Sequence, residues 1–191
     1  MTLRILASIA FCVLIEGCAT VPVGQHQPPA ESVVTLRDSG IAAVNVGEFK
    51  LAAGLNLALD KSVSVRGNQV DSPNGNSFSL YLKESLIADL KAAGKYDATA
   101  PLSIQGELTE NELNAAGFSE ANAVLAAHFT VKNGNQLIYD RVLRQQSTWK
   151  SSFVGAIAIP EARNQYANGY TQLLAQLYAD QNFRTACGAG L

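Results

Sequence analysis

The feature that most constrains the fold is a pair of alternating segments joined by Asn133 and Gly134. Apolar residues occupy every second position from residue 125 to residue 131, and a similar alternation returns from residue 137 to residue 143. A period of two buries one face of a strand, and Asn-Gly readily adopts the positive φ angles of a tight hairpin turn. The sequence therefore predicts an antiparallel β-hairpin with one buried face, whose second strand continues toward Trp149.

Four shorter segments before the hairpin also have the composition of strands, namely residues 32–36, 41–46, 62–66 and 102–108. Residues 62–66 and 102–108 alternate apolar and polar side chains, as expected for strands with one face in a core. Residues 49–59 show no clear period, and the polar residues 109–122 are expected to form a loop or a short helix.

Two segments have helical periodicity. Ser77 is suited to cap the first helix and Gly94 to end it, while Pro160 is suited to the first position of a second helix that ends near residues 180–183. The apolar stripe of the first helix is Phe78, Leu82, Leu86, Leu90 and Ala93, and that of the second is Ala162, Tyr166, Tyr170, Leu173, Leu174 and Leu177.

These elements predict an α+β fold in a single domain over residues 32–183. A mixed or mainly antiparallel sheet of about five strands, with both helices packed on one face, would bury the two helix stripes and one face of each strand. Such a two-layer sandwich describes the architecture and leaves the function open. Residues 184–191 are expected to form a frayed C-terminal tail.

The N-terminus has the pattern of an export signal. Arg4 precedes an uncharged apolar run over residues 5–15, which is followed by Gly17 and Cys18. The run is well short of the roughly 20 residues that cross a bilayer as a helix, so it is expected to be removed and not to span a membrane. Residues 1–17 are therefore predicted to be a signal peptide.

Ile15, Glu16, Gly17 and Cys18 resemble the lipobox of bacterial lipoproteins. The resemblance implies that Cys18 is the first residue of the mature chain and carries a diacylglyceryl group and an amide-linked fatty acid such as palmitate. Because two or more acyl chains hold a protein stably on a membrane, this lipid would be a lasting anchor. Ala19 after the cysteine favours the outer membrane, on its periplasmic face. The alternative is cleavage after Ala19, which would release a soluble secreted protein.

Residues 18–31 are expected to form the lipidated cysteine and a flexible tether, because the stretch is rich in Pro and Gln and lacks hydrophobic periodicity. His26 is expected to be a solvated residue of this tether. Cys12 leaves with the signal and Cys18 carries the lipid, so Cys187 has no disulfide partner in the mature chain. Cys187 is interpreted as a spare thiol on the tail, the alternative being an intermolecular disulfide or a redox site.

The composition and motifs do not support catalysis. A formal net charge of −2 leaves no basic field for nucleic acid or an anionic membrane surface. His128 is the only histidine outside the tether, no residues have the spacing of metal ligands, and neither a glycine-rich phosphate loop nor a Gly-x-Ser-x-Gly motif is present. We therefore expect no enzymatic activity and no catalytic, cofactor-binding or metal-binding residues.

Trp149, Phe153 and Val154 lie outside the apolar stripes and are candidate interface residues. The expected function is that of a non-catalytic outer-membrane lipoprotein that faces the periplasm and binds an envelope protein or a cell-wall component, as a scaffold or assembly accessory. Binding would use the sheet face or residues 149–159. The alternative is a carrier of lipid or another apolar ligand between sheet and helices, suggested by the apolar residues 49–59 and 153–159.

The order of these elements resembles that of small Gram-negative envelope lipoproteins of the YajG type. The matching features are Cys18, the segment Val65-Arg66-Gly67, the helix after it, the hairpin and the terminal helix. A more distant resemblance is to LptE, the lipopolysaccharide-assembly lipoprotein, although residues 19–24 lack the Gly-Phe and Arg-Gly stretch that follows the lipid-bearing cysteine in LptE-like chains. Only Cys18 carries over as a functional residue.

Replacing Cys18 with serine tests the anchor. We expect Cys18→Ser to move the protein from the membrane fraction to the soluble fraction, because the acyl chains have lost their point of attachment. Cell fractionation and immunoblotting measure the change. Retention of the variant on the membrane would mean that the lipid is not what holds the protein there. Mass spectrometry of the native protein that finds an unmodified N-terminus at another residue would contradict the lipid anchor.

Overall fold

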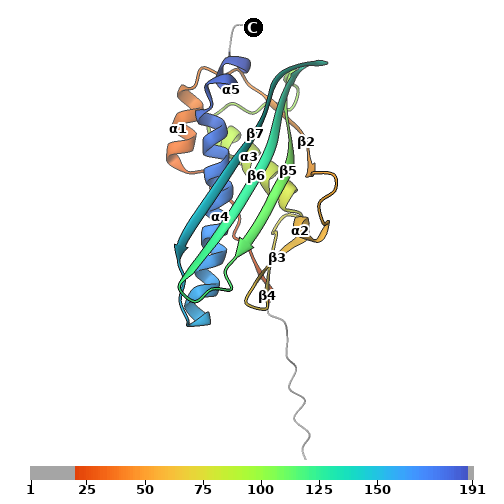
Figure 1. Cartoon of the computed structure of the whole chain (residues 1–191). Helices are drawn as coiled ribbons and strands as arrows, with labels where there is room; N and C mark the ends of the chain where they lie inside the picture. The colour runs from red at the N-terminus through yellow and green to blue at the C-terminus, as the bar shows by residue number, and fades with distance from the viewer. Residues whose placement is uncertain (1–19, 189–191) are drawn as a thin grey trace, which may run out of the picture.

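The computed structural model describes residues 20–188, so the predicted signal peptide and Cys18 lie outside the described residues. The main sheet contains β2 (Asn45–Leu51), β5 (Leu102–Asn114), β6 (Glu120–Asn133) and β7 (Gln136–Lys150), in the order β2-β5-β6-β7 (Figure 1). β2 runs parallel to β5, and the other two pairs are antiparallel. The sheet is therefore mixed.

Two long helices, α3 (Phe78–Ala92) and α4 (Gly155–Ala179), cover one face of this sheet. α3 lies against β2 and β5, α4 lies against β6 and β7, and α1 (Ala30–Asp38) packs on α3 and α4 from outside. In residues 20–188 no helix covers the opposite face of the sheet (Figure 1). The predicted α+β architecture, with two helices on one face of a sheet, is confirmed. The remaining helices, α2 (Ala58–Lys61) and α5 (Gln181–Ala186), are short.

Residues 62–65 were predicted to form a strand of the main sheet, but they lie in a second, smaller sheet. β1 (Thr20–Pro22), β4 (Asn68–Asp71) and β3 (Ser62–Val65) lie in the order β1-β4-β3. β3 and β4 form a tight hairpin through Arg66 and Gly67, so part of the polar stretch after residue 66 is a strand. Both turn residues have positive φ angles, 49° and 78°, which a tight two-residue turn requires.

The two predicted helices and their apolar stripes are present. The Ser77 hydroxyl oxygen accepts a hydrogen bond from the N–H of Leu80 at 3.1 Å, and Gly94 follows α3 with a φ of 70°. Every aromatic and leucine residue of the two predicted stripes is fully buried. The hydroxyls of Tyr166 and Tyr170 on α4 both donate to Oδ1 of Asn111 on β5, at 2.5 and 2.9 Å, which ties the helix to the sheet inside the core.

The hairpin between β6 and β7 is also present, but its turn lies one residue later than predicted. Asn133 pairs with Gln136, so Gly134 and Asn135 form the loop. Of these two loop residues only Gly134 has a positive φ angle, 58°. β7 reaches Lys150, as the predicted extension toward Trp149 required.

Two secondary-structure predictions were wrong. Residues 32–36 were expected to be a strand but lie in α1, because Ser32 and Leu36, four residues apart, are both buried against the neighbouring helices. Residues 109–122 were expected to be a loop or a short helix, but β5 continues to Asn114. A register shift between Leu108 and Glu110 lets this polar segment stay paired with β6.

The flexible tether predicted over residues 18–31 is wrong for residues 20–31. β1 pairs with β4 from Thr20 to Pro22, and the N–H of Val23, a buried residue, donates to the carbonyl of Asp71 at 2.9 Å. The helix α1 then begins at Ala30. The segment therefore belongs to the domain, whose N-terminal boundary lies earlier than the predicted residue 32.

The His26 side chain is buried and contacts a carboxylate, so the prediction of a solvated residue was wrong. Its side chain is 5 % exposed, and its Nε2 lies 2.7 Å from Oδ1 of Asp89 on α3. Oδ2 of the same carboxylate accepts a hydrogen bond from the hydroxyl of Tyr178 on α4 at 2.7 Å. Three elements thus meet at one buried carboxylate.

The C-terminal residues 184–187 are ordered, so the predicted frayed tail is wrong for this part. α5 extends to Ala186, and the carbonyl of Cys187 accepts a hydrogen bond from the N–H of Ala42 at 2.7 Å. The Cys187 side chain is fully buried, and burial raises the pKa of its thiol to about 12. The contact with Ala42 explains why residues 184–187 are ordered. Such a contact between distant residues leaves no periodic pattern in the sequence.

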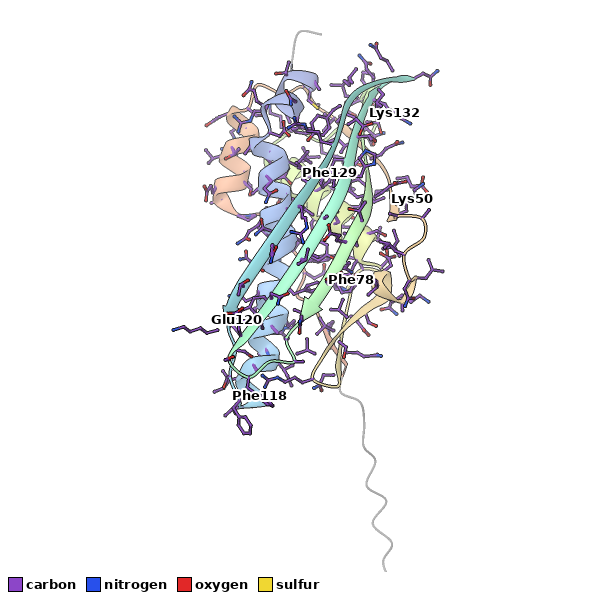
Figure 2. All side chains as sticks on the ribbon, in the orientation of Figure 1. Lys50, Phe78, Phe118, Glu120, Phe129 and Lys132 are labelled. Atoms are coloured by element: carbon purple, nitrogen blue, oxygen red, sulfur yellow. The ribbon has the colours of Figure 1, made fainter. Side chains whose placement is uncertain are left out.

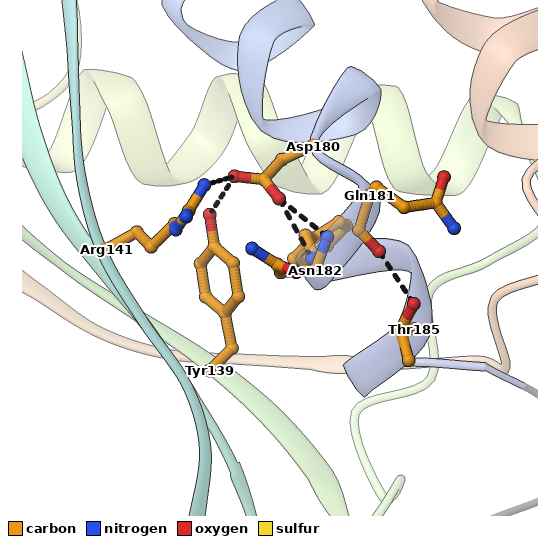
Figure 3. A network of polar contacts seen from close by, with 7 residues as sticks. Tyr139, Arg141, Asp180, Gln181, Asn182 and Thr185 are labelled. Atoms are coloured by element: carbon orange, nitrogen blue, oxygen red, sulfur yellow. Dashed lines mark hydrogen bonds and ion pairs between the residues drawn. The ribbon is translucent and has the colours of Figure 1, made fainter.

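Asp180 joins α4, α5 and β7 (Figure 3). Its Oδ1 accepts hydrogen bonds from the N–H groups of Asn182 and Phe183, and its Oδ2 lies 3.2 Å from both the Tyr139 hydroxyl and the Arg141 guanidinium. Burial alone would raise the pKa of Asp180. The hydrogen bonds to its carboxylate outweigh burial and hold the pKa below the ordinary value of 3.8.

This lowered pKa predicts acid sensitivity. The charge of Asp180 stabilises the folded state above the unfolded pKa, and that contribution is lost as the pH falls through the folded pKa. We expect the free energy of unfolding of the native protein to drop more steeply between about pH 4 and pH 2 than that of Asp180→Asn, which keeps a capping oxygen but has no charge to lose. Urea unfolding followed by circular dichroism at several pH values measures this. Asp38→Asn, at an exposed carboxylate, is the control, and equal pH slopes for Asp180→Asn and the native protein would contradict the prediction.

Candidate interaction surface

One end of the molecule carries a cluster of exposed apolar side chains, which we call the apolar tip. It consists of Phe118 from the loop between β5 and β6, with Phe153, Val154 and Ile157 from the segment that leads into and begins α4. Their exposed fractions are 62 %, 77 %, 51 % and 61 %. The rings of Phe118 and Phe153 are in contact, with centroids 5.1 Å apart. Figure 2 shows Phe118 projecting into solvent at this end.

Arg66 holds the loops of the apolar tip together. Its guanidinium donates to the carbonyls of Ala115 at 3.1 Å, Gly117 at 2.7 Å and Phe153 at 3.4 Å, and to the Ser151 hydroxyl at 3.1 Å. It also lies 5.3 Å from the centroid of the Phe118 ring. A planar guanidinium can serve several carbonyls at once, so one side chain fixes both loops against the β3–β4 hairpin.

The start of α4 explains why Ile157 belongs to the tip. The helix begins at Gly155 and not at the predicted Pro160, because the N–H of Ala158 donates to the carbonyl of Val154 at 3.0 Å. The apolar residues 155–159 therefore form the start of α4, shortly after β7 ends at Lys150. Ala158 faces the protein and Ile157 faces solvent.

Two of the three predicted interface residues are exposed, and the third is not. Phe153 and Val154 are exposed in the tip, whereas Trp149 is half-buried and packs against the core. The sequence prediction misses Phe118 and Ile157. A large apolar residue within the turn-forming stretch Gly117-Phe118-Ser119, outside any period that would bury it, is the signal that could have identified Phe118.

The uncovered face of the main sheet carries a second candidate, which we call the outer-face hollow. Its volume is about 460 Å³, and it is lined mainly by charged and polar side chains. Lys50 Nζ lies 3.1 Å from Glu107 Oε1 within it. Because exposed ion pairs contribute at most about 1 kcal/mol each, these charges shape the surface more than they stabilise the fold. The lining includes Lys50, Glu107, His128, Thr130, Lys132 and Leu137.

His128 lies in the outer-face hollow between two carboxylates. Its Nε2 is 2.6 Å from Oδ1 of Asp140, and its Nδ1 is 4.0 Å from Oε2 of Glu107. Asp140 is within hydrogen-bond distance of His128, whereas the 4.0 Å between Nδ1 and Glu107 is too long for a hydrogen bond. His128 and these two carboxylates form a charged and polar cluster on the open face of the sheet.

Residues 20–188 contain neither a candidate metal site nor a helix that could span a membrane. No group of three His, Cys, Asp or Glu side chains in this range is placed to hold a metal ion. In the same range, no helix combines the length and the apolar character needed to cross a bilayer.

The two apolar segments considered for a ligand carrier lie in different parts of the molecule. Phe49 of β2 packs inside the domain, with its ring centroid 6.3 Å from that of Phe129. Its ring occupies the space above Gly106, where an added Cβ would lie 2.4 Å from Phe49 Cε1. Residues 153–157, in contrast, form the apolar tip.

Comparison by sequence gave no relatives. No protein-family model matches the chain, and no curated protein matches it.

Comparison by structure found proteins similar to this chain. The chain is similar to XCC0632 from Xanthomonas campestris, which carries the family label DUF330, with a TM-score of 0.57 and 14 % identity over 84 % of this chain and 92 % of that one. An uncharacterized protein aligns with a TM-score of 0.50 and 14 % identity over 72 % of this chain and 90 % of that one. A protein from Caulobacter crescentus, provisionally named a lipoprotein, aligns with a TM-score of 0.46 and 10 % identity over 82 % and 96 % of the two chains.

At these identities the likeness shows the fold alone. The chain thus has the two-layer α+β fold of the DUF330 protein XCC0632. The resemblance to YajG-type lipoproteins and to LptE remains one of sequence pattern, since none of these three proteins carries either name.

The role of Arg66 can be tested with a conservative change. Arg66→Lys keeps the charge but loses the planar group that reaches several carbonyls at once, so we expect a loss of about 1–2 kcal/mol in the free energy of unfolding. We also expect faster amide hydrogen exchange at residues 115–119 and 151–154, measured by mass spectrometry. Arg163→Lys, whose guanidinium bonds the side chain of its neighbour Asn164, is the matched control. Unchanged exchange at both loops in Arg66→Lys would show that other contacts hold the tip.

Proposed function

We propose that the protein is a non-catalytic lipoprotein, anchored to the outer membrane through Cys18 and facing the periplasm. In this proposal it binds another envelope protein through the open face of its main sheet and so acts as a scaffold or assembly accessory. The signal-like N-terminus and the lipobox pattern at residues 15–18 support the anchor.

The observation that carries the binding role is the one-sided cover of the main sheet. α3 and α4 bury one face, while the other face presents Leu137 and Val142, 48 % and 61 % exposed, among the charges of the outer-face hollow. β7 is also an edge strand of this sheet, and edge strands offer backbone hydrogen-bonding groups to a partner. Exposed apolar side chains within a charged rim are typical of surfaces that bind proteins.

Two other functions find less support in the geometry. A catalytic role would centre on His128, but its contact with Asp140 is exposed on the sheet face and does not lie in an enclosed pocket. A ligand carrier would need space between sheet and helices, but Phe78, Tyr166 and Tyr170 fill this layer and contact one another at centroid distances of 5.2–5.9 Å.

Site-specific photocrosslinking in living cells tests the binding role. A photoreactive amino acid at Val142 of the full chain is expected to form a discrete adduct with an envelope protein, which mass spectrometry identifies. The same amino acid at Val34, 51 % exposed on α1, is the matched control and is expected to give no such adduct. Leu137→Asp should reduce the Val142 adduct, because a charge replaces an exposed apolar side chain on the same strand and the same open face. Absence of an adduct at Val142, or equal adducts at both positions, would count against the open face as the binding surface.

A further inference from the structure

We propose that the apolar tip is a membrane-contact site: Phe118, Phe153, Val154 and Ile157 insert into the surface of the bilayer that holds the acyl chains on Cys18. This inference rests on the lipid anchor of the proposed function. It adds a second, non-covalent attachment and therefore a fixed orientation of the domain.

The first step is the short path from the anchor to the folded domain. Consecutive Cα atoms are 3.8 Å apart, so the Cα of Cys18 lies within about 8 Å of the Cα of Thr20 whatever path the chain takes. From Thr20 onward the segment is fixed, by pairing with β4 and by the contact between His26 and Asp89. No flexible linker therefore separates the folded domain from the membrane in this proposal, and the domain is held close to the bilayer.

The second step is the position of the tip relative to this exit. Thr20 is the partner of Gln69 at the start of β4, just after the turn at Arg66 and Gly67. The guanidinium of Arg66 in turn lies against the Phe118 ring and bonds the carbonyl of Phe153. The exit of the chain and the apolar tip therefore share one end of the molecule. Figures 1 and 2 show β4, the start of α4 and Phe118 at this end, opposite α5.

The third step is the chemistry of the tip. Two aromatic and two aliphatic side chains project from backbone that Arg66 holds in place, so ordering them on a membrane costs little additional entropy. Aromatic rings with polar groups at their base are typical of the boundary between headgroups and acyl chains. Glu120 and Lys150 are paired across β6 and β7 at the same end, so their opposite charges give no strong preference for anionic lipid.

The bilayer is favoured over a protein as the occupant because of this proximity. The cysteine proposed to carry the acyl chains is only two residues from Thr20, so the membrane surface lies close to the tip, which would otherwise remain in water beside it. With the tip inserted, α5 points away from the membrane. The outer-face hollow then lies to the side, where a partner can reach it.

A fluorescent probe on the lipidated full chain tests the inference. Phe153→Cys and, separately, Ile157→Cys are labelled with nitrobenzoxadiazole, and Val142→Cys on the open sheet face is the matched control. Cys187 is buried, so the added thiol reacts selectively. The proteins are reconstituted into vesicles of phosphatidylethanolamine with phosphatidylglycerol and, in parallel, of phosphatidylcholine. Circular dichroism confirms that each labelled variant is folded, and the probe at Ile157 leaves the Phe118 and Phe153 ring pair intact.

We expect the probes at residues 153 and 157 to shift to shorter wavelength in both kinds of vesicle and to lose most of their emission to doxyl-labelled lipid. The probe at residue 142 should keep its emission in water. If the protein floats with the vesicles but the probes at 153 and 157 stay in water, the tip is not a membrane-contact site and the anchor stands. If the probe at 142 enters the bilayer equally, the fixed orientation is wrong. If the protein does not float and Cys18 is unmodified, the anchor and this inference fall together.

Discussion

The arrangement of the molecule depends on one buried carboxylate. Asp89 on α3 is almost completely enclosed and is bonded to His26 of the N-terminal segment and to Tyr178 of α4. An enclosed charge without partners costs several kcal/mol, so the three elements are held together by the need to satisfy it. Burial and the adjacent negative charge raise the pKa of Tyr178 well above its usual value, which keeps this hydroxyl a donor to Asp89. The contact also explains why residues 20–31 belong to the domain and why the proposed anchor sits so close to it.

The sequence was sufficient to predict those helices and strands whose signals lie within the element itself. α3 was found from its capping serine and its stripe, α4 from its stripe, and the hairpin from its alternation and its glycine. It was insufficient wherever order comes from distant contacts. The residues around His26 have the composition of a tether, but their partner Asp89 is 63 positions away. Distant contacts also explain why residues 32–36 are helical. Burial of Ser32 and Leu36 against other helices outweighs the preference of the β-branched residues in this segment for strands.

The candidate site divides in a similar way. Phe153 and Val154 could be predicted because they are large, apolar and outside every stripe, and the structure leaves both exposed. Trp149 met the same criterion, but its position on β7 turns it toward the core. Phe118 and Arg66 could not be paired from the sequence, because the hydrogen bonds that assemble the tip join residues 49 to 87 positions apart. The outer-face hollow likewise depends on the register of β2, β5 and β6.

The burial of Cys187 has a consequence for the biogenesis of the protein. In the periplasm, where the proposed function places the protein, an unpaired thiol would be open to thiol–disulfide exchange, and the reacting species is the thiolate. Enclosure between α5 and the backbone near Ala42 keeps this sulfur protonated and out of reach once folding is complete. Covalent cross-linking through Cys187 is then open only to chains that have not finished folding, so disulfide-linked dimers would mark misfolded protein and not a native assembly.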